Sequence, residues 1–374
     1  MNINIDLPKD MVVRIRQAVE RGDYESPQDF VERALRNQLE HDETPDTEAM
    51  TLEEAFAAVD TEASVPRPEP EPPSDAVNSR QEIEIQPAEA TEVHLTLLET
   101  DKAVPTVPAP DRSRLEDGPL WGQYNRIFPV KIVVRALGNS VSDAPAGSDE
   151  KAGWIPHSSF GESVAETARI LGMKIAQYDK RSGRGRGEKL STGLPVGDDP
   201  SRSKERFVSH FVGETERDDN LTGAAPQLQF VNIQKTGTGI DIGLTKMGWE
   251  FAALENPLLD GGAGAQTALS ADERAFFLAH VREHYTEEYD AMATVVKAIH
   301  DGDDRPDSLT NRVAYLNTEW SASHARTIRS GLTGRMYELG LLDRYRVGQR
   351  GVGYELTDEG ASFLDEVTAG DYNN

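Results

Sequence analysis

One internal repeat constrains the fold of this chain more than any other feature of the sequence. The pattern Leu-Thr-x-x-Gly-x-x-Phe occurs at Leu244–Phe251 and again at Leu356–Phe363, 112 residues later. Each copy follows two β-prone runs joined by a glycine-rich turn, which predicts a hairpin before each copy. Each threonine can cap a short helix whose phenylalanine folds back onto the core. We therefore expect two domains of one architecture.

Length and composition exclude several classes of protein. A chain of 374 residues is long enough for two or three domains. It has no run of 18 apolar residues and no charged-then-apolar leader, so we expect a cytoplasmic protein with no membrane partner. Since cysteine is absent, disulfides, thiolate nucleophiles and Cys-based metal sites are excluded.

The charge is unevenly distributed. Of the net charge of −26, residues 41–120 contribute −15, with 20 Asp/Glu against five Lys/Arg. The chain has 11 Lys and 28 Arg among abundant acids, a composition that resembles proteins of extreme halophiles, whose acidic surfaces keep them soluble in concentrated salt. On such a background, the segments where the acidity is locally reversed are the informative ones.

Residues 43–117 are predicted to form a disordered acidic linker. The stretch 45–117 holds 10 of the 21 prolines and few aromatic residues, which favours an extended, self-repelling chain. Inside it, the apolar run "VHLTLL" at 93–98 is interpreted as a passing hydrophobic stretch, with a docking segment as the alternative.

Residues 1–42 are patterned as one strand followed by two helices. "NINIDL" alternates polar and apolar side chains, Pro8 ends it, and the second helix begins at "YESPQDF" with Ser26 as its N-cap. One strand and two helices cannot bury a stable core alone. In an intertwined dimer the strands of the two chains would pair with each other, and the two chains would share one core.

This strand–Pro–helix–GxYxS–helix pattern resembles the ribbon-helix-helix DNA-binding family. The resemblance implies a homodimer whose paired strands enter the major groove of double-stranded DNA and read bases through Asn2, Asn4 and Asp6. Backbone amides at Ser26 and Gln28 would bind a phosphate. In this family the base-reading residues usually include Arg, Lys or Thr, whereas none of Asn2, Asn4 and Asp6 is basic. The alternative is therefore that the strand serves dimerisation alone.

The segment 268–370 is predicted to contain three helices, the second hairpin and a final helix. Ser270 and Glu273 form a capping box before one long helix that continues through Tyr285 to Ile299. A second helix, "LTNRVAYLN", and a third precede the hairpin. This order, together with "YELGLLDRY…YELTDEG", resembles the winged-helix family.

The winged-helix resemblance implies a recognition helix over Ser321–Leu339 and a wing tip over Gly348–Gly351. The implied DNA-contacting residues are Ser321, Ser323, His324, Arg326, Thr327, Arg329 and, in the wing, Arg350. Seven Arg against three acids between Arg312 and Arg350 favour contact with phosphate. The alternative is a helix whose arginines pair with the acidic surface.

The middle segment, 118–262, is interpreted as a second winged-helix-like domain with a long insertion at 190–225. An apolar helix-like run reaches Leu137, and an amphipathic helix with its apolar stripe at Phe160, Val164, Ile170 or Leu171, Ile175 and Tyr178 leads into "RSGRGRGEK". We expect this loop to be a flexible basic arm for a DNA groove. Its basic residues are Lys180, Arg181, Arg184, Arg186 and Lys189.

One enzymatic pattern is present. "HVREH" at His280–His284 matches the H-x-x-E-H pattern of a metallopeptidase group, with Glu355 or Glu359 as a third ligand. The histidines lie beside the apolar stripe of their helix, so we interpret them as boundary residues and expect no enzyme, no metal and no cofactor.

Together these expectations describe a fold that is mainly α with small β: a ribbon-helix-helix head, a disordered acidic linker and two winged-helix-like α+β domains. The predicted function is a dimeric, sequence-specific DNA-binding protein acting as a transcriptional regulator. A plasmid or chromosome partition protein, with a partition ATPase as partner, is one alternative. An antitoxin-like module that binds a toxin is the other.

Overall fold

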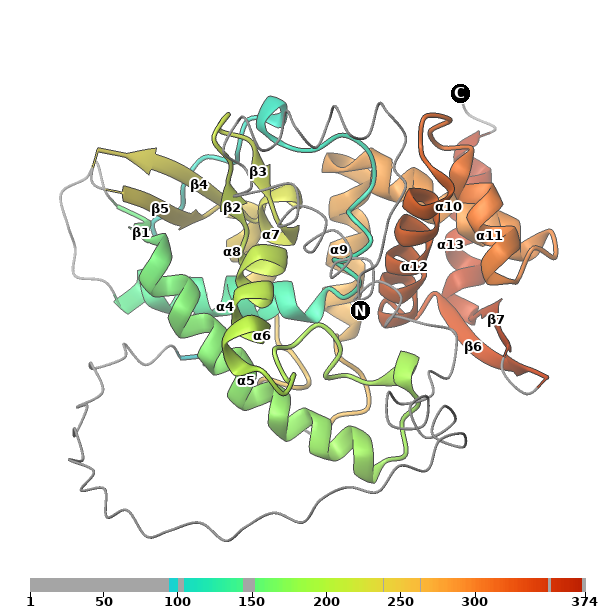
Figure 1. The fold of residues 1–374 in the computed structure, drawn as a ribbon, viewed down its shortest axis with the longest axis horizontal. Helices are drawn as coiled ribbons and strands as arrows, with labels where there is room; N and C mark the ends of the chain where they lie inside the picture. Colours follow the sequence, from blue (N-terminus) through green and yellow to red (C-terminus); the bar gives the residue numbers. More distant parts are fainter. Residues whose placement is uncertain are drawn as a thin grey trace, which may run out of the picture. The chain divides into compact units, whose positions relative to one another are not determined.

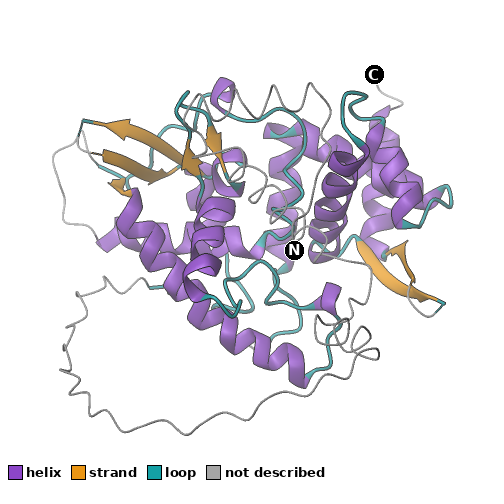
Figure 2. Cartoon of the chain, in the orientation of Figure 1, coloured by secondary structure: helices purple, strands orange, loops and turns teal. Residues whose placement is uncertain are grey.

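The structure, a computed structural model, describes residues 94–99, 104–143 and 152–371, apart from Thr238, Ala263, Gln349 and Arg350. The predicted head at 1–42 lies outside these residues. The described part is mainly helical with small antiparallel sheets (Figure 2), which confirms the coarse fold class. None of its helices is both long enough and apolar enough to cross a membrane.

The first half of the described chain contains a small three-stranded sheet, which lies at the left of Figure 1. The strands follow the antiparallel order β1–β5–β4, and Ile242 of β5 lies opposite both Ile155 of β1 and Ile233 of β4. The elements are η1 (Arg112–Arg114), α4 (Phe128–Asp143), β1 (Trp154–Pro156), α5 (His157–Arg181), η3 (Arg186–Glu188), α6 (Pro200–Phe207), a π-helical turn η4 (Val208–Val212), β2 (Glu214–Thr215), β3 (Leu221–Thr222), α7 (Ala224–Gln227), β4 (Val231–Thr236), β5 (Gly239–Leu244) and α8 (Lys246–Ala253).

The second half has the element order that the sequence predicts, with one additional break. Its helices lie beside a two-stranded sheet, which projects at the lower right of Figure 1. The elements are α9 (Ala271–His284), α10 (Thr286–His300), α11 (Pro306–Ala314), α12 (Ala322–Glu338), β6 (Leu342–Val347), β7 (Gly351–Leu356) and α13 (Asp358–Asp371).

The prediction of one long helix from Ser270 to Ile299 is wrong, because the chain bends at Tyr285 between α9 and α10. Tyr285 has φ −142° and ψ 64°, and its hydroxyl donates to the carbonyl oxygen of Gly118 at 2.9 Å. In the first turn of α10 the buried Glu288 accepts from the amide of Leu120 at 2.9 Å. Contacts with a distant segment thus end α9, with neither glycine nor proline at the bend.

The Leu-Thr-x-x-Gly-x-x-Phe repeat has the same geometry in both copies. The hydroxyl oxygen of Thr245 accepts from the amide of Gly248 at 3.1 Å, and that of Thr357 accepts from Gly360 at 2.9 Å. Phe251 and its counterpart Phe363 are both buried. The predicted threonine caps and core phenylalanines are therefore confirmed.

The likeness extends to the residues before each hairpin. Gln229 and Gly340 both have positive φ, 56° and 74°, and each follows a helix and precedes a strand. Each accepts, through its carbonyl oxygen, the hydroxyl proton of the repeat threonine, at 2.7 Å and 2.5 Å. Helix, left-handed residue, hairpin and threonine-capped helix therefore occur twice, with the preceding helix much shorter in the first copy, α7.

The predicted linker extends too far toward the C-terminus, because its last described parts pack on the folded body. Residues 94–99 place Leu98 in the core, and the interpretation of "VHLTLL" as a passing run is wrong. Farther on, the amide of Val107 donates to the carbonyl oxygen of Leu244 at 2.8 Å beside β5. A proline-rich chain is already extended, so it can lie along a strand with its few apolar side chains buried.

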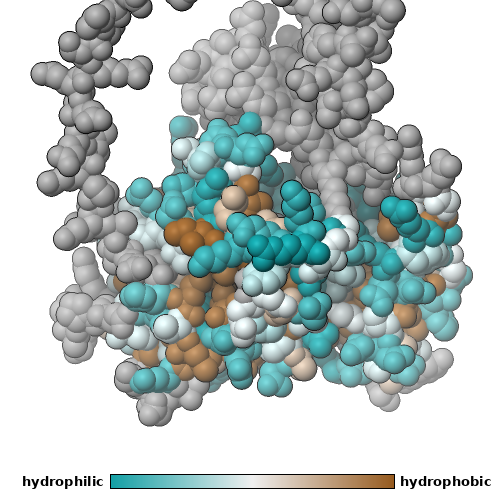
Figure 3. Space-filling model, turned by 90° about the horizontal axis from the view of Figure 1, so that it is seen from below, coloured by the Kyte–Doolittle hydropathy of each residue, from teal (hydrophilic) through white to brown (hydrophobic). Residues whose placement is uncertain are grey.

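Helix α5 presents one apolar stretch outward. Of the alternatives left open at its centre, Leu171 packs against the core, whereas Ile170 is 54% exposed. Met173 and Tyr178 are also exposed, so Tyr178 does not belong to the buried stripe. Figure 3 shows apolar side chains among hydrophilic ones on the face seen from below, the side on which α5 runs in Figure 1.

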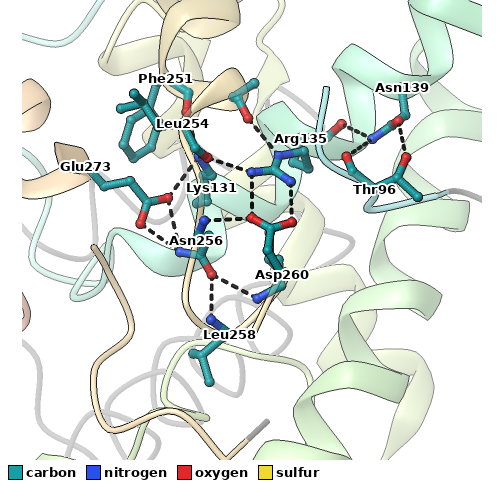
Figure 4. Close-up of polar contacts among 12 residues, drawn as sticks. Thr96, Lys131, Arg135, Asn139, Phe251, Leu254, Asn256, Leu258, Asp260 and Glu273 are labelled. Carbon is teal, nitrogen blue, oxygen red and sulfur yellow. Dashed lines mark hydrogen bonds and ion pairs between the residues drawn. The ribbon is translucent and has the colours of Figure 1, made fainter. Parts of the chain in front are cut away.

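A buried ion pair connects α4 to the start of α9 (Figure 4). The ammonium of Lys131 lies 2.8 Å from a carboxylate oxygen of Glu273, and neither side chain is exposed. Lys131 also donates to the carbonyl oxygens of Phe251 and Leu254, both at 2.6 Å. Burial lowers the pKa of Lys131 to about 8 even though Glu273 opposes the shift. Glu273 and Ser270 form the predicted capping box, which is confirmed.

The same polar network continues through Arg135 and the loop after α8. Arg135 donates to the carbonyl oxygen of Ala252 at 2.7 Å and pairs with Asp260 at 2.9 Å. The side-chain amide of Asn256 donates to Glu273 at 2.9 Å. Cations from α4 thus satisfy the last carbonyl groups of α8, which would otherwise be buried without partners.

The network connects parts of the chain that the sequence assigns to separate domains, 118–262 and 268–370. The described residues up to Tyr345 and from Val352 onward belong to one compact unit, and their buried apolar side chains form one continuous core. The two halves therefore share an interior.

Candidate nucleic-acid interface

Helix α12 is the element that the sequence predicts to read DNA, and only its first half has an exposed face. Ser321 caps the helix by accepting from the amide of His324 at 3.1 Å. From Gly331 to Met336 every residue is buried. Any contact between α12 and a large partner is therefore restricted to its first three turns.

The second half of α12 is covered by residues 118–126, here called the crossing segment, which runs beside the helix in Figure 1. A side chain at Gly122 or Gly331 would overlap backbone atoms of the opposing segment, so two glycines allow this close crossing. Arg335 donates to the carbonyl oxygen of Tyr124 at 2.7 Å and pairs with the buried Glu288, also at 2.7 Å.

The structure places the predicted recognition residues at three different depths. Ser321, Ser323 and Arg326 are exposed, and His324 and Thr327 are half-buried. Arg329 is buried, and its Nε donates to the hydroxyl of Thr310 at 3.3 Å, so its predicted place on the exposed start of the helix is wrong. The exposed stripe instead continues to Ser330, one helical turn after Arg326, a position that the sequence analysis missed.

Several arginines of the positive segment have structural partners. Arg312 forms an ion pair with Asp303 at 2.6 Å, and Arg335 and Arg329 are held in the interior as described. Arg344 is half-buried, with its guanidinium 5.5 Å from the centre of the Tyr354 ring. The alternative of arginines paired within the protein therefore accounts for part of the local charge. Arg326 has no acidic partner among the residues that the structure describes.

The hairpin that the winged-helix resemblance interprets as a wing is present as the β6–β7 pair, and Arg350 at its predicted tip lies outside the described residues. Near the base of the pair, the hydroxyl of Tyr345 donates to the carboxylate of Asp304. The amide of Tyr354 donates to the backbone carbonyl oxygen of Asp304 at 3.0 Å. The turn between α10 and α11 thus fixes the base of this hairpin.

The basic loop after α5 is folded against the body, so the expectation of a flexible arm is wrong. Arg184 pairs with the buried Asp179 at 3.2 Å. The same carboxylate accepts from the amides of Leu190 and Ser191 at 3.1 Å and 3.0 Å. One buried carboxylate therefore fixes both ends of the loop. Lys180 and Arg181 are exposed at the end of α5, Lys189 is exposed as well, and the backbone of Arg186 opens η3.

The predicted base readers Asn2, Asn4 and Asp6 and the phosphate-binding pair Ser26 and Gln28 lie outside the described residues.

The "HVREH" pattern does not form a metal site in the described structure. His280 is buried against Phe230, and its Nε2 lies 2.8 Å from the carbonyl oxygen of Leu228. Burial lowers the pKa of His280 to about 4, so the ring is neutral at pH 7 and Nε2 carries the proton. No group of three or more His, Cys, Asp or Glu side chains within the described residues could hold a metal ion.

A cleft of about 570 Å³ opens beside the start of α12. Carboxylates from two segments line it, Glu116 and Asp117 before the crossing segment and Glu214 and Glu216 around β2. Aromatic side chains also line it, namely Trp121, Tyr124, Trp320 and the histidines His210 and His324. We call this feature the acidic cleft. Its carboxylates would repel phosphate, which leaves Ser323, Arg326 and Ser330 as the part of α12 suited to nucleic acid.

The sequence gives no local signal for the acidic cleft. Glu116 and Glu214 are about 100 residues apart, and His324 follows about 110 residues later. Only the folded chain brings them together.

Comparisons of this chain with protein-family models, with curated proteins and with solved structures find no match.

Proposed function

We propose that this chain is a dimeric, sequence-specific DNA-binding protein that regulates transcription. The observation that carries the proposal is the exposed stripe Ser323–Arg326–Ser330 on α12. It lies on the third helix of an α10–α11–α12–hairpin–α13 arrangement. An arginine with no acidic partner among the described residues, flanked by two hydroxyl groups, suits a phosphate or the edge of a guanine.

The buried second half of α12 supports a rigid reading element. Its contacts with the crossing segment fix the axis of the helix, and groups held on rigid elements keep their geometry on binding. Dimerisation is assigned to the ribbon-helix-helix-like head at 1–42. Two weak DNA-binding units on one chain would gain affinity through effective concentration.

Genome-wide immunoprecipitation of the tagged full chain tests the proposal, with Arg326→Gln as the informative variant. Loss of one arginine contact to DNA costs about 1–3 kcal/mol, so we expect its enrichment to fall about fivefold or more. Arg282→Gln is the matched control, because Arg282 is exposed on α9 and its nearest carboxylate is 3.9 Å away.

Peaks at promoters that weaken in Arg326→Gln and persist in Arg282→Gln would support the proposal. A single cluster of repeats on one replicon would instead indicate a partition protein. Absence of peaks, both for the intact chain and after deletion of residues 1–42, would refute DNA binding.

A further inference from the structure

The acidic cleft is lined by four carboxylates and by two histidines, His210 and His324, and its lining contains no Lys or Arg side chain. Desolvation and the like charge of Glu216 both raise the pKa of Glu116. Carboxylates from two separate segments of the chain therefore repel one another in a cleft whose lining has no Lys or Arg. A cation in the cleft would relieve this repulsion.

The aromatic walls distinguish this cleft from an ordinary acidic surface. The imidazole of His324 lies between two indoles, 4.8 Å from Trp121 and 5.0 Å from Trp320, measured between ring centres. Burial lowers the pKa of His324, so this ring is neutral at pH 7 and is not itself the missing cation. Aromatic faces attract organic ammonium groups and favour those with apolar surface over small hydrated metal ions.

One buried polar group also faces the cleft. Tyr124 is only 5% exposed, and its phenolic oxygen accepts from the amide of Gly223 at 2.9 Å. No described residue accepts the proton of this hydroxyl in turn. The tyrosine can therefore donate a hydrogen bond to a molecule in the cleft.

We propose that the acidic cleft is a binding site for an organic polycation, a chain of ammonium groups joined by methylene units. The volume of about 570 Å³ is in the range of small-molecule sites and far exceeds that of one metal ion. Carboxylates from two segments of the chain can pair with separate ammonium groups of one molecule, and Trp121 and Trp320 offer apolar faces to its methylene units. The proposal does not depend on DNA binding, because the cleft forms within one chain.

Titration of the full chain with spermidine, without DNA and in 0.5 M KCl, tests the proposal. Calorimetry gives the stoichiometry, and tryptophan fluorescence reports on Trp121 and Trp320. We expect saturable binding of one spermidine per chain with a change in fluorescence. Glu214→Gln/Glu216→Gln should weaken binding at least tenfold, and Trp320→Leu about fivefold.

The matched control is Glu359→Gln/Asp365→Asn, which removes the same charge from the exposed face of α13. Its affinity should equal that of the unaltered chain. The proposal is overturned if this control weakens binding as much as the cleft variant, because diffuse surface charge would then explain the affinity. It is also overturned if the cleft variant binds normally, or if MgCl2 at equal ionic strength produces the same fluorescence change.

Discussion

Replacing Glu273 by glutamine isolates the charge of the buried pair with Lys131. Glutamine has nearly the same volume, and its carbonyl oxygen can still accept from the amide of Ser270, as a carboxylate oxygen of Glu273 does at 2.7 Å. The capping hydrogen bond is therefore kept. The change removes the negative charge 2.8 Å from a lysine whose side chain has no exposed surface.

The expected loss is large because the remaining cation cannot reach water. Removing one partner of a buried ion pair typically costs about 3–5 kcal/mol of unfolding free energy. The two carbonyl oxygens that accept from Lys131 offset part of this cost, so we expect about 3 kcal/mol. In a body of this size that loss lowers the thermal midpoint by about 10 °C.

Urea unfolding of the full chain, followed by tryptophan fluorescence, measures the effect. Glu250→Gln is the control, because its pair with Lys246 is exposed at 3.8 Å and should contribute less than about 0.5 kcal/mol. Lys131→Met/Glu273→Gln should recover more than half of the loss, since a packed apolar side chain leaves no buried charge. Equal losses in the single and double variants, or a single variant within about 1 kcal/mol of the parent, would refute the reasoning.

Two further predictions concern the repeat and the pH dependence of stability. Alanine at Gly248 or at Gly360 would overlap a backbone carbonyl oxygen, so each should lose about 2–3 kcal/mol in the same urea assay. Gly237→Ala, with open space around it, should be neutral, and a neutral Gly360→Ala would contradict the equivalence of the two copies. The pKa of Lys131 falls from 10.5 to about 8 on folding. Between these values the unfolded chain binds more protons, so unfolding free energy rises with pH. Lys131→Met should show a smaller rise between pH 7.5 and 9.5 than the parent, and an equal rise would exclude this lysine as the cause.

The features that the sequence predicted correctly are local. The caps at Thr245 and Thr357 and the box of Ser270 with Glu273 join residues three apart, and their geometry depends on the nearby backbone. Hairpins before each cap follow from glycine-rich turns of the same short range. The caps and the hairpins can be predicted because they do not depend on contacts with distant residues.

The features that were predicted wrongly depend on distant partners. The bend at Tyr285 has no turn residue, and it coincides with contacts to the crossing segment. Arg329 is of a residue type that commonly contacts DNA, yet its side chain lies against Thr310 of the preceding helix. Arg184 was predicted to be mobile from its glycine neighbours, whereas Asp179 holds it. The acidic cleft could not be inferred at all, since its walls come from three remote segments.

The crossing segment has a consequence for biosynthesis. Arg335 donates to the carbonyl oxygens of Leu120 and Tyr124, which precede it by 215 and 211 residues. A ribosome adding about 5–20 residues per second needs roughly 10–40 s to synthesise the intervening chain. During that time the segment and the start of α4 have no α12 to cover them. The interior of this protein therefore closes only when nearly the whole chain has left the ribosome, and a transcript truncated before Arg335 would yield a chain whose crossing segment lacks this partner.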